Sequence, residues 1–174
     1  MLEKNEIKTK DLNREYKRFI GEKKLDYYLT KFERMEEKGT KISFNLCGLI
    51  FSFFWCFYRK MFVPGAIFLA YNFLVMYISM RFISSTSTIV SGVFAVLNLI
   101  PPLICGFFGN YLYSNYVHSC IEKSLNMPNL QKEKFYKENG DTSTRITLDI
   151  VVAYVVFSLA LMLSYLPNIQ GWNV

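Results

Sequence analysis

The sequence lacks the motifs from which enzymes and metal proteins commonly build their sites. It has one histidine, no His-Glu-x-x-His or Gly-x-Ser-x-Gly motif, and no glycine-rich loop that would cradle a phosphate. No Cys-x-x-Cys pair occurs, and His118 with Cys120 would supply too few ligands for a structural zinc ion. We therefore predict a non-enzymatic protein with no catalytic, cofactor-binding or metal-binding residues. We expect unpaired, buried thiols that behave as small apolar groups at Cys47, Cys56, Cys105 and Cys120.

Charge is absent from two long stretches of the chain. Residues 82–121 and residues 150–174 contain no Asp, Glu, Lys or Arg. Apolar runs of about 20 residues match the hydrocarbon core of a bilayer, which is about 30 Å thick. The sequence therefore predicts an integral membrane protein whose first partner is the lipid bilayer. The first 40 residues lack the apolar core of a cleavable signal peptide, so we expect an internal segment to direct insertion.

Charged residues gather instead at the N-terminus, where residues 1–42 hold 12 Lys/Arg and 9 Asp/Glu. This region is expected to form two helical stretches, residues 3–20 and 22–38, separated at Gly21. In the second stretch apolar residues recur three or four positions apart, which predicts an amphipathic helix that ends at Gly39. Its apolar face either lies on anionic lipid headgroups, docks a partner, or packs on its own protein. The face comprises Leu25, Tyr28, Leu29, Phe32 and Met35.

Four apolar segments follow, at about residues 44–58, 61–80, 89–113 and 146–166. The first has 15 residues. At 1.5 Å per residue it reaches only about 22 Å, which is short of a full crossing. The sequence therefore favours a re-entrant or interfacial helix there, and transmembrane helices for the other three segments.

The distribution of Lys and Arg supports the same topology. Crossing by all four segments would divide the basic residues 13 to 7, whereas a first segment that only dips into lipid leaves 19 on one side and Arg81 alone on the other. Basic residues in short connections stay in the cytoplasm, so we predict the second arrangement. Arg59 and Lys60 then remain on the cytoplasmic face. The net charge of +6 is explained by topology, and we expect no nucleic-acid partner.

The predicted fold class is all-α: a polytopic membrane protein with three transmembrane helices, one short re-entrant or interfacial helix, and amphipathic N-terminal cytoplasmic helices. The N-terminus is expected in the cytoplasm and the C-terminus outside. The predicted regions are a charged cytoplasmic part (1–42), the short apolar helix (43–60), the first two transmembrane helices (61–113), a cytoplasmic connection (114–145), and the third transmembrane helix with a short tail (146–174).

Three stretches resemble a known family. FNLCGLIFSFFWCFYRKMF (residues 44–62) is similar to the Phe-Asn…Trp-x-x-Tyr-Arg-Lys-Met signature of small bacterial membrane proteins catalogued as domain of unknown function 2628. Residues 19–45 and 109–123 resemble its lead-in and a later element. The chain departs from the family pattern in LCGLIFSF (residues 46–53) and in GDTS (residues 140–143). The resemblance implies a bacterial membrane protein and lends no established activity.

Five polar residues are expected at membrane depth, where an unpartnered polar group is costly. They are Asn45, Asn72, Asn98, Asn110 and Asp149. Asn amides can hydrogen-bond across helices with about 0.6–2 kcal/mol each, so one interpretation is structural and the other is a substrate pathway. Asp149 is expected to pair with Arg145, one helical turn away, or with the cations of the short segment.

Pro101 and Pro102 lie inside the third apolar segment. Because proline has no N–H, they leave the carbonyls near Leu97 and Asn98 without their usual helical partners. This predicts a kink, and free carbonyls of this kind form binding sites in transporters.

Aromatic rings and cations adjoin one another at the end of the short segment, in Trp55, Tyr58, Arg59 and Lys60. Such a combination is typical of the headgroup level of a membrane, so these residues are candidates for a lipid or partner interface. We expect a scaffold, accessory or regulatory binding protein of the bacterial inner membrane, with a protein partner, a second copy or anionic headgroups as its ligands. The alternative is a subunit of an oligomeric channel or transporter that uses Asn72 and Asn98.

Overall fold

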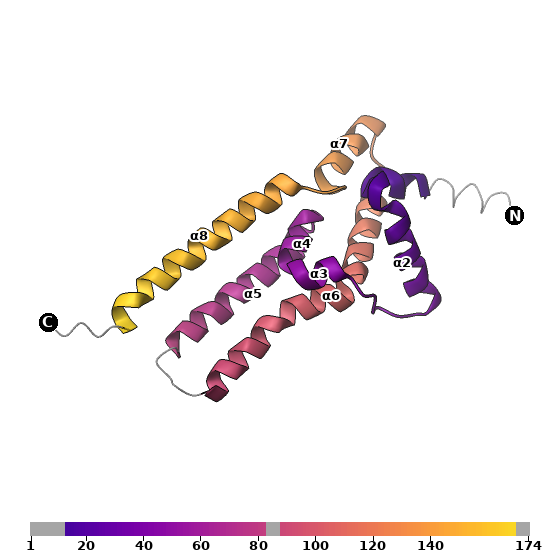
Figure 1. Cartoon of the computed structure of the whole chain (residues 1–174). Helices are drawn as coiled ribbons and strands as arrows, with labels where there is room; N and C mark the ends of the chain where they lie inside the picture. The colour runs from indigo at the N-terminus through magenta and orange to yellow at the C-terminus, as the bar shows by residue number, and fades with distance from the viewer. Residues whose placement is uncertain (1–12, 83–87, 170–174) are drawn as a thin grey trace, which may run out of the picture.

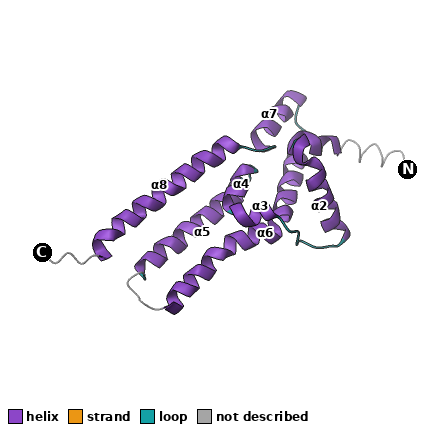
Figure 2. Cartoon of the chain, viewed as in Figure 1, coloured by secondary structure: helices purple, strands orange, loops and turns teal. Residues whose placement is uncertain are grey.

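The computed structural model describes residues 13–82 and 88–169, and within them the fold is helical without any strand (Figure 2). Residues 13–20 are helical and lead through a short 3-10 turn, η1 (Glu22–Lys24), into α2 (Leu25–Glu37). The all-α prediction is confirmed. Residues 3–12 of the first predicted stretch and the predicted tail at 170–174 lie outside the described residues.

Three helices are long and apolar enough to cross a membrane, as predicted: α5 (Phe62–Arg81), α6 (Thr88–Ser124) and α8 (Thr144–Ile169). In Figure 1 the end of α5, the start of α6 and the end of α8 lie at one end of the molecule. The N-terminal helices and α7 (Asn129–Asn139) lie at the other end. The chain is therefore a membrane protein with three spans and one helical end.

The third apolar segment forms a longer helix than the sequence predicted. α6 has 37 residues, which corresponds to about 55 Å and exceeds the thickness of the hydrocarbon core. Residues 114–124 were assigned to a polar connection, but Val117 and Ile121 are buried and continue the helix with a four-residue spacing. The second half of α6 therefore leaves the membrane region and packs among the N-terminal helices.

We call residues 13–38, the second half of α6 (residues 106–124) and α7 the helical head. Its breaks are those expected, because Gly21 and Gly39 have φ values of 85° and 58°, which glycine adopts without strain. The apolar face of α2 packs inside the protein, with Tyr28, Phe32 and Met35 buried. The head core comprises Tyr16, Phe19, Ile20, Tyr28, Phe32, Met35, Tyr113, Val117, Cys120, Ile121 and Tyr136.

The short apolar segment consists of two helices, α3 (Leu46–Phe51) and α4 (Phe53–Tyr58). Ser52 lies between them with a φ of 49°, which prevents one continuous helix. α3 crosses α6 so closely that a Cβ atom at Gly48 would overlap the carbonyl oxygen of Cys105. Glycine is therefore required at this crossing.

The short segment begins and ends at the head end of the spans. At its start, the N–H groups of Ser43 and Asn45 donate to the carbonyls of Phe107 and Gly106, at 2.8 and 2.7 Å. At its end, the carbonyl of Tyr58 accepts from the N–H of Ser143, at 2.9 Å, immediately before α8 begins. The two ends of the segment are therefore both fixed near the head, and its re-entrant or interfacial position in lipid stays a prediction.

Candidate functional site

Two asparagines from distant parts of the chain fix α3 to α6. The side-chain oxygen of Asn45 accepts from the N–H of Gly48 at 3.0 Å and so caps α3. The amide nitrogen of Asn45 donates to the side-chain oxygen of Asn110 at 3.2 Å, and Asn110 donates to Oγ of Ser43 at 3.0 Å. Both amides are buried. This arrangement agrees with the structural interpretation of these two residues.

Arg59 follows α4 and is buried beneath aromatic rings, with only 3% of the residue exposed. Its guanidinium carbon lies 4.5 Å from the ring centre of Tyr28, 5.3 Å from that of Tyr113 and 5.6 Å from that of Tyr58. Ring faces attract a cation without accepting its hydrogen bonds in ordinary geometry. Within the described part of the chain, Nε and Nη1 of Arg59 have no hydrogen-bond partner. The site therefore holds a buried cation with unused donors.

Lys60 turns away from Arg59 towards α7. Its Nζ donates to the carbonyl of Lys137 at 2.7 Å, in the last turn of α7, where carbonyls lack helical partners and a cation is favourable. Burial lowers the pKa of Lys60, and the charge of Asp141 opposes this shift. Lys60 therefore joins the short segment to the head.

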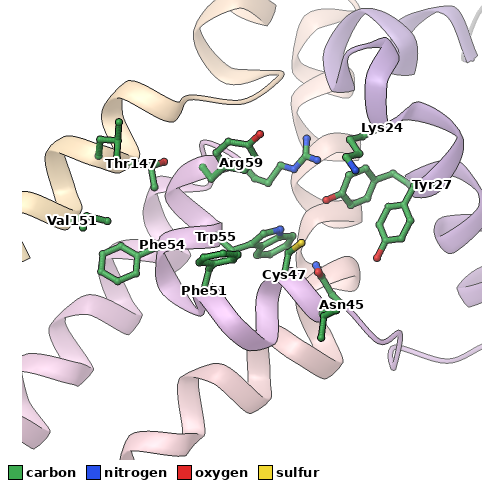
Figure 3. Close-up of a pocket in the computed structure, with 14 residues that line it drawn as sticks. Lys24, Tyr27, Asn45, Cys47, Phe51, Phe54, Trp55, Arg59, Thr147 and Val151 are labelled. Carbon is green, nitrogen blue, oxygen red and sulfur yellow. The ribbon is translucent and has the colours of Figure 1, made fainter.

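Arg59 borders a cleft of about 580 Å³ between α2, α3, α4 and the start of α8. No Asp or Glu is among the residues that line it. Its two charged residues are Arg59 and Lys24, and in Figure 3 their side chains extend towards each other from α4 and from the start of α2. The apolar and aromatic part of the wall is made mainly by Leu46, Phe51, Phe54, Trp55, Leu148 and Val151.

The four predicted interface residues divide between this cleft and the head. Trp55, Tyr58 and Arg59 line the cleft, whereas Lys60 does not. Trp55, Arg59 and Lys60 are buried, so these side chains contact their own chain. Their contact with lipid or a partner stays a prediction.

Sequence reasoning did not single out Lys24 as a cleft residue. Lys24 precedes the first residue of α2 and provides no side-chain cap. A cation at the N-terminus of a helix is unfavourable for the helix dipole. The presence of Lys24 there could therefore have indicated that this side chain has a role other than stabilising α2. The cleft residues of α8 could not be found in this way, because nothing in their local sequence marks them.

Asn72 and Asn98 occupy different environments. The side-chain oxygen of Asn72 accepts from the hydroxyl of Tyr154 at 2.7 Å and so links α5 to α8. The amide of Asn98 donates to the carbonyl of Phe94 at 2.8 Å, within its own helix, and the residue is exposed. The structure does not bring these two amides together in a common site.

The carbonyl of Leu97, which was predicted to lose its helical partner through Pro101, accepts instead from the hydroxyl of Tyr71 at 3.0 Å. α5 thereby satisfies the backbone group that the proline leaves free, and this carbonyl serves to pack two spans.

Asp149 forms no ion pair among the described residues, so the predicted pairing with Arg145, Arg59 or Lys60 is wrong. Asp149 and Arg145 are both exposed on α8. Exposed pairs of this kind gain little free energy, which is consistent with the absence of the pair.

Three of the four cysteines are buried as predicted. Sγ of Cys56 and Sγ of Cys105 lie 3.9 Å apart as free thiols, and Cys120 is buried in the head. The prediction is wrong for Cys47, which is exposed and lines the cleft. α3 is packed on α6 through its glycine face, so the neighbouring Cys47 points outward.

Comparison with known proteins gives one family. The model of the family described as "Protein of unknown function (DUF2628)" matches residues 11–118. The match covers the first helices of the head, the short segment, α5 and most of α6. No curated protein and no solved structure matches the chain.

Proposed function

We propose that this chain, which belongs to the DUF2628 family, is a non-enzymatic scaffold, accessory or regulatory protein of the bacterial cytoplasmic membrane. It binds a second membrane protein, or a second copy of itself, through the lateral surface of α8. The helical head lies in the cytoplasm with the N-terminus, and the C-terminus lies outside.

The observation that supports this proposal is the open surface of α8. This span packs chiefly on α4, where the ring of Tyr154 lies 5.5 Å from that of Phe53 and 5.6 Å from that of Phe54. It has no buried residue between positions 144 and 164. α5 contacts α8 through side chains of one region, where the ring of Phe73 lies 5.5 Å from that of Tyr154 and 4.8 Å from that of Phe157. Helices in lipid associate by close side-chain packing, so an open span offers a surface for a partner helix.

The orientation is supported by the distribution of basic residues. Every Lys and Arg among the described residues belongs to the head, the short segment, the connection between them (Lys41) or the start of α8, except Arg81 at the far end of α5. Keeping these cations in the cytoplasm satisfies the positive-inside rule. A thiol reagent that cannot cross the membrane tests this: in a Cys47→Ser background, Lys38→Cys should react only after the cells are opened. Reaction in intact cells would contradict the orientation.

Purification of the tagged chain in a mild detergent tests the partner. A stoichiometric partner or a homo-oligomer is expected, and Val156→Trp on the open face of α8 should reduce its recovery severalfold. Val93→Trp is the matched control, because Val93 is also exposed, on the span of α6. A monomer with no partner, or equal effects of the two variants, would contradict the proposal.

The second candidate is a subunit of an oligomeric channel or transporter. The observation in its favour is that Asn98, a polar residue on a span, is exposed and could face a neighbouring subunit. Reconstituted vesicles should then show a flux that Asn98→Leu abolishes. A flux that is unchanged in this variant would remove the basis for this function.

A further inference from the structure

We propose that the cleft beside Arg59 binds one anionic phospholipid of the membrane. The phosphate lies against Arg59 and Lys24, and an acyl chain lies along the apolar wall formed by α3, α4 and α8. This site requires neither a protein partner nor a second copy, so the test of lipid binding is independent of the test of the function proposed above.

The charge of the cleft identifies the ligand as an anion. Arg59 is almost fully buried, and Nε and Nη1 have no partner among the described residues. The hydroxyls of Tyr28 and Tyr113 interact with Arg59, but a buried charge with unused donors remains unfavourable. Lys24 extends towards the same region from the other side of the cleft (Figure 3), and no carboxylate of the lining lies there to balance the two cations. An anion would remove both costs at once.

Phosphate fits these donors better than a neutral headgroup does. The guanidinium group can offer two parallel N–H groups to two oxygens of one phosphate, and a lysine adds a single point charge. The N-terminus of α2 also favours an anion at this place, because it is the positive end of the helix dipole and Lys24 lies there. A zwitterionic headgroup carries the same phosphate but adds a positive group beside the two cations, and an uncharged headgroup offers no anion.

The remainder of the cleft identifies the ligand as an amphiphile. Away from the cations the wall is aromatic and aliphatic, with Phe51, Phe54 and Val151 along it. The cleft volume of about 580 Å³ lies within the range of about 300–1,000 Å³ typical of small-molecule sites. A soluble anion would leave this wall in contact with water, which is unfavourable. An acyl chain would cover it.

The position of the cleft suits a lipid. Arg59 lies three residues before the start of α5, and Thr147, Leu148 and Val151 belong to the first turns of α8. The cations therefore lie at the head end of two spans, where the headgroup layer meets the hydrocarbon core. The rings of Tyr27 and Trp55 line the same cleft, and amphipathic rings of this type favour the headgroup level.

Cys47 provides a built-in reporter for occupancy. It lines the cleft and is exposed, whereas the other three cysteines are buried. The full chain in a mild neutral detergent is titrated with phosphatidylglycerol or with phosphatidylcholine that carries the same acyl chains, and the rate of Cys47 alkylation is measured. We expect phosphatidylglycerol to slow the reaction at concentrations about tenfold lower than phosphatidylcholine does, which corresponds to one charge-assisted interaction. Cys47→Ser should abolish the signal.

Three variants test the assignment of the residues. Arg59→Gln and Lys24→Gln should remove the preference for phosphatidylglycerol, whereas Lys38→Gln, which removes a charge from the other end of α2, should retain it. Because Arg59→Gln also removes packing on Tyr28, Val151→Trp gives an independent test. This variant keeps both cations, fills the apolar part of the cleft and should abolish protection by lipid.

The proposal is overturned if the two lipids protect Cys47 equally or not at all. It is also overturned if the preference survives in both Arg59→Gln and Lys24→Gln. Glycerol phosphate, which carries the headgroup without acyl chains, separates the two anion sources: protection as strong as that by phosphatidylglycerol would assign the cleft to a soluble phosphate and reject a lipid site.

Discussion

The helical head and the three spans use the same apolar residue types in opposite ways. On α6 alone, Ile121 in the head is 3% exposed, whereas Ile89 in the span is 79% exposed. Water around the head drives apolar side chains together, but lipid is as apolar as the side chains and provides no such force between spans. The head is therefore held by its core, and the spans are held by a few polar contacts and by the short segment between them.

Truncation of matched isoleucines on α6 should give the largest difference between the two regions. Ile121→Ala leaves a cavity in the head core and should lower the free energy of unfolding by about 2–5 kcal/mol. Ile89→Ala should change it by less than about 0.5 kcal/mol, because lipid or detergent replaces the lost contacts. Denaturation of the purified variants, followed by near-ultraviolet circular dichroism, provides the measurement. Equal costs would show that the comparison is wrong.

Two glycines test how closely α3 is packed against α6, where the short segment meets the spans. Gly48→Ala places a Cβ against the Cys105 carbonyl of α6, and we expect a loss of about 1–3 kcal/mol or a displaced α3. Gly92→Ala is the control, since no atom lies within 4 Å of its added Cβ, and alanine in place of a helical glycine should stabilise by about 0.5–1 kcal/mol. Thermal unfolding in one detergent compares them. A tolerated Gly48→Ala would mean that α3 can separate from α6.

The polar link between spans should have a smaller effect. Asn72→Leu removes the bond to Tyr154 that joins α5 to α8, and the expected cost is about 0.6–2 kcal/mol. Asn98→Leu removes a bond within a single helix and should cost less. Proteolysis of detergent-solubilised protein, followed by release of α8, reports the difference. If Asn98→Leu releases α8 as readily as Asn72→Leu, the span contact is not the cause.

Acid should weaken the head slightly and leave the spans unaffected. Partial burial favours the protonated form of Glu15, but the hydrogen bond from Tyr136 and the charges of Lys132 and Arg18 together lower its pKa below the ordinary value of 4.5. Because the pKa of Glu15 is lower in the folded protein than in the unfolded chain, its ionised carboxylate stabilises the folded state at pH values above the ordinary pKa. This stabilisation is lost as the pH falls through the pKa of the folded state. The melting temperature should therefore fall below about pH 4.5, and the fall should be smaller in Glu15→Gln. An identical pH profile in both proteins would contradict this.

The sequence was sufficient for those parts of the fold that local chemistry determines. The lack of charge located the spans, Gly21 and Gly39 located the breaks, and the paired prolines located a carbonyl that needed a partner. The end of α6 was missed because its apolar residues alternate with polar ones. That face is buried only because the N-terminal helices, which are distant in sequence, and α7 pack against it.

The candidate site was predictable only in part, for the same reason. Arg59 was conspicuous as a charge between apolar segments, but its burial requires Tyr28 from α2 and Tyr113 from α6, which no local pattern connects to it. Asp149 was expected to pair with Arg145 by helical spacing or with the cations of the short segment, and the structure leaves it exposed. The spacing of residues in the sequence indicates which side chains lie on the same face of one helix. The cleft, in contrast, depends on how α2, α3, α4 and α8 pack against one another.

The unbroken course of α6 makes this helix a lever. It extends 18 residues beyond Gly106, where the extended chain ahead of α3 is hydrogen-bonded across it, and this arm is about 27 Å long. A change of 10° in the tilt of the span would swing its tip by roughly 5 Å, carrying α2 and α7 with it. A hydrophobic span that is longer than the bilayer is thick can adapt by tilting, so a change in membrane thickness that tilts α6 would reorient the head.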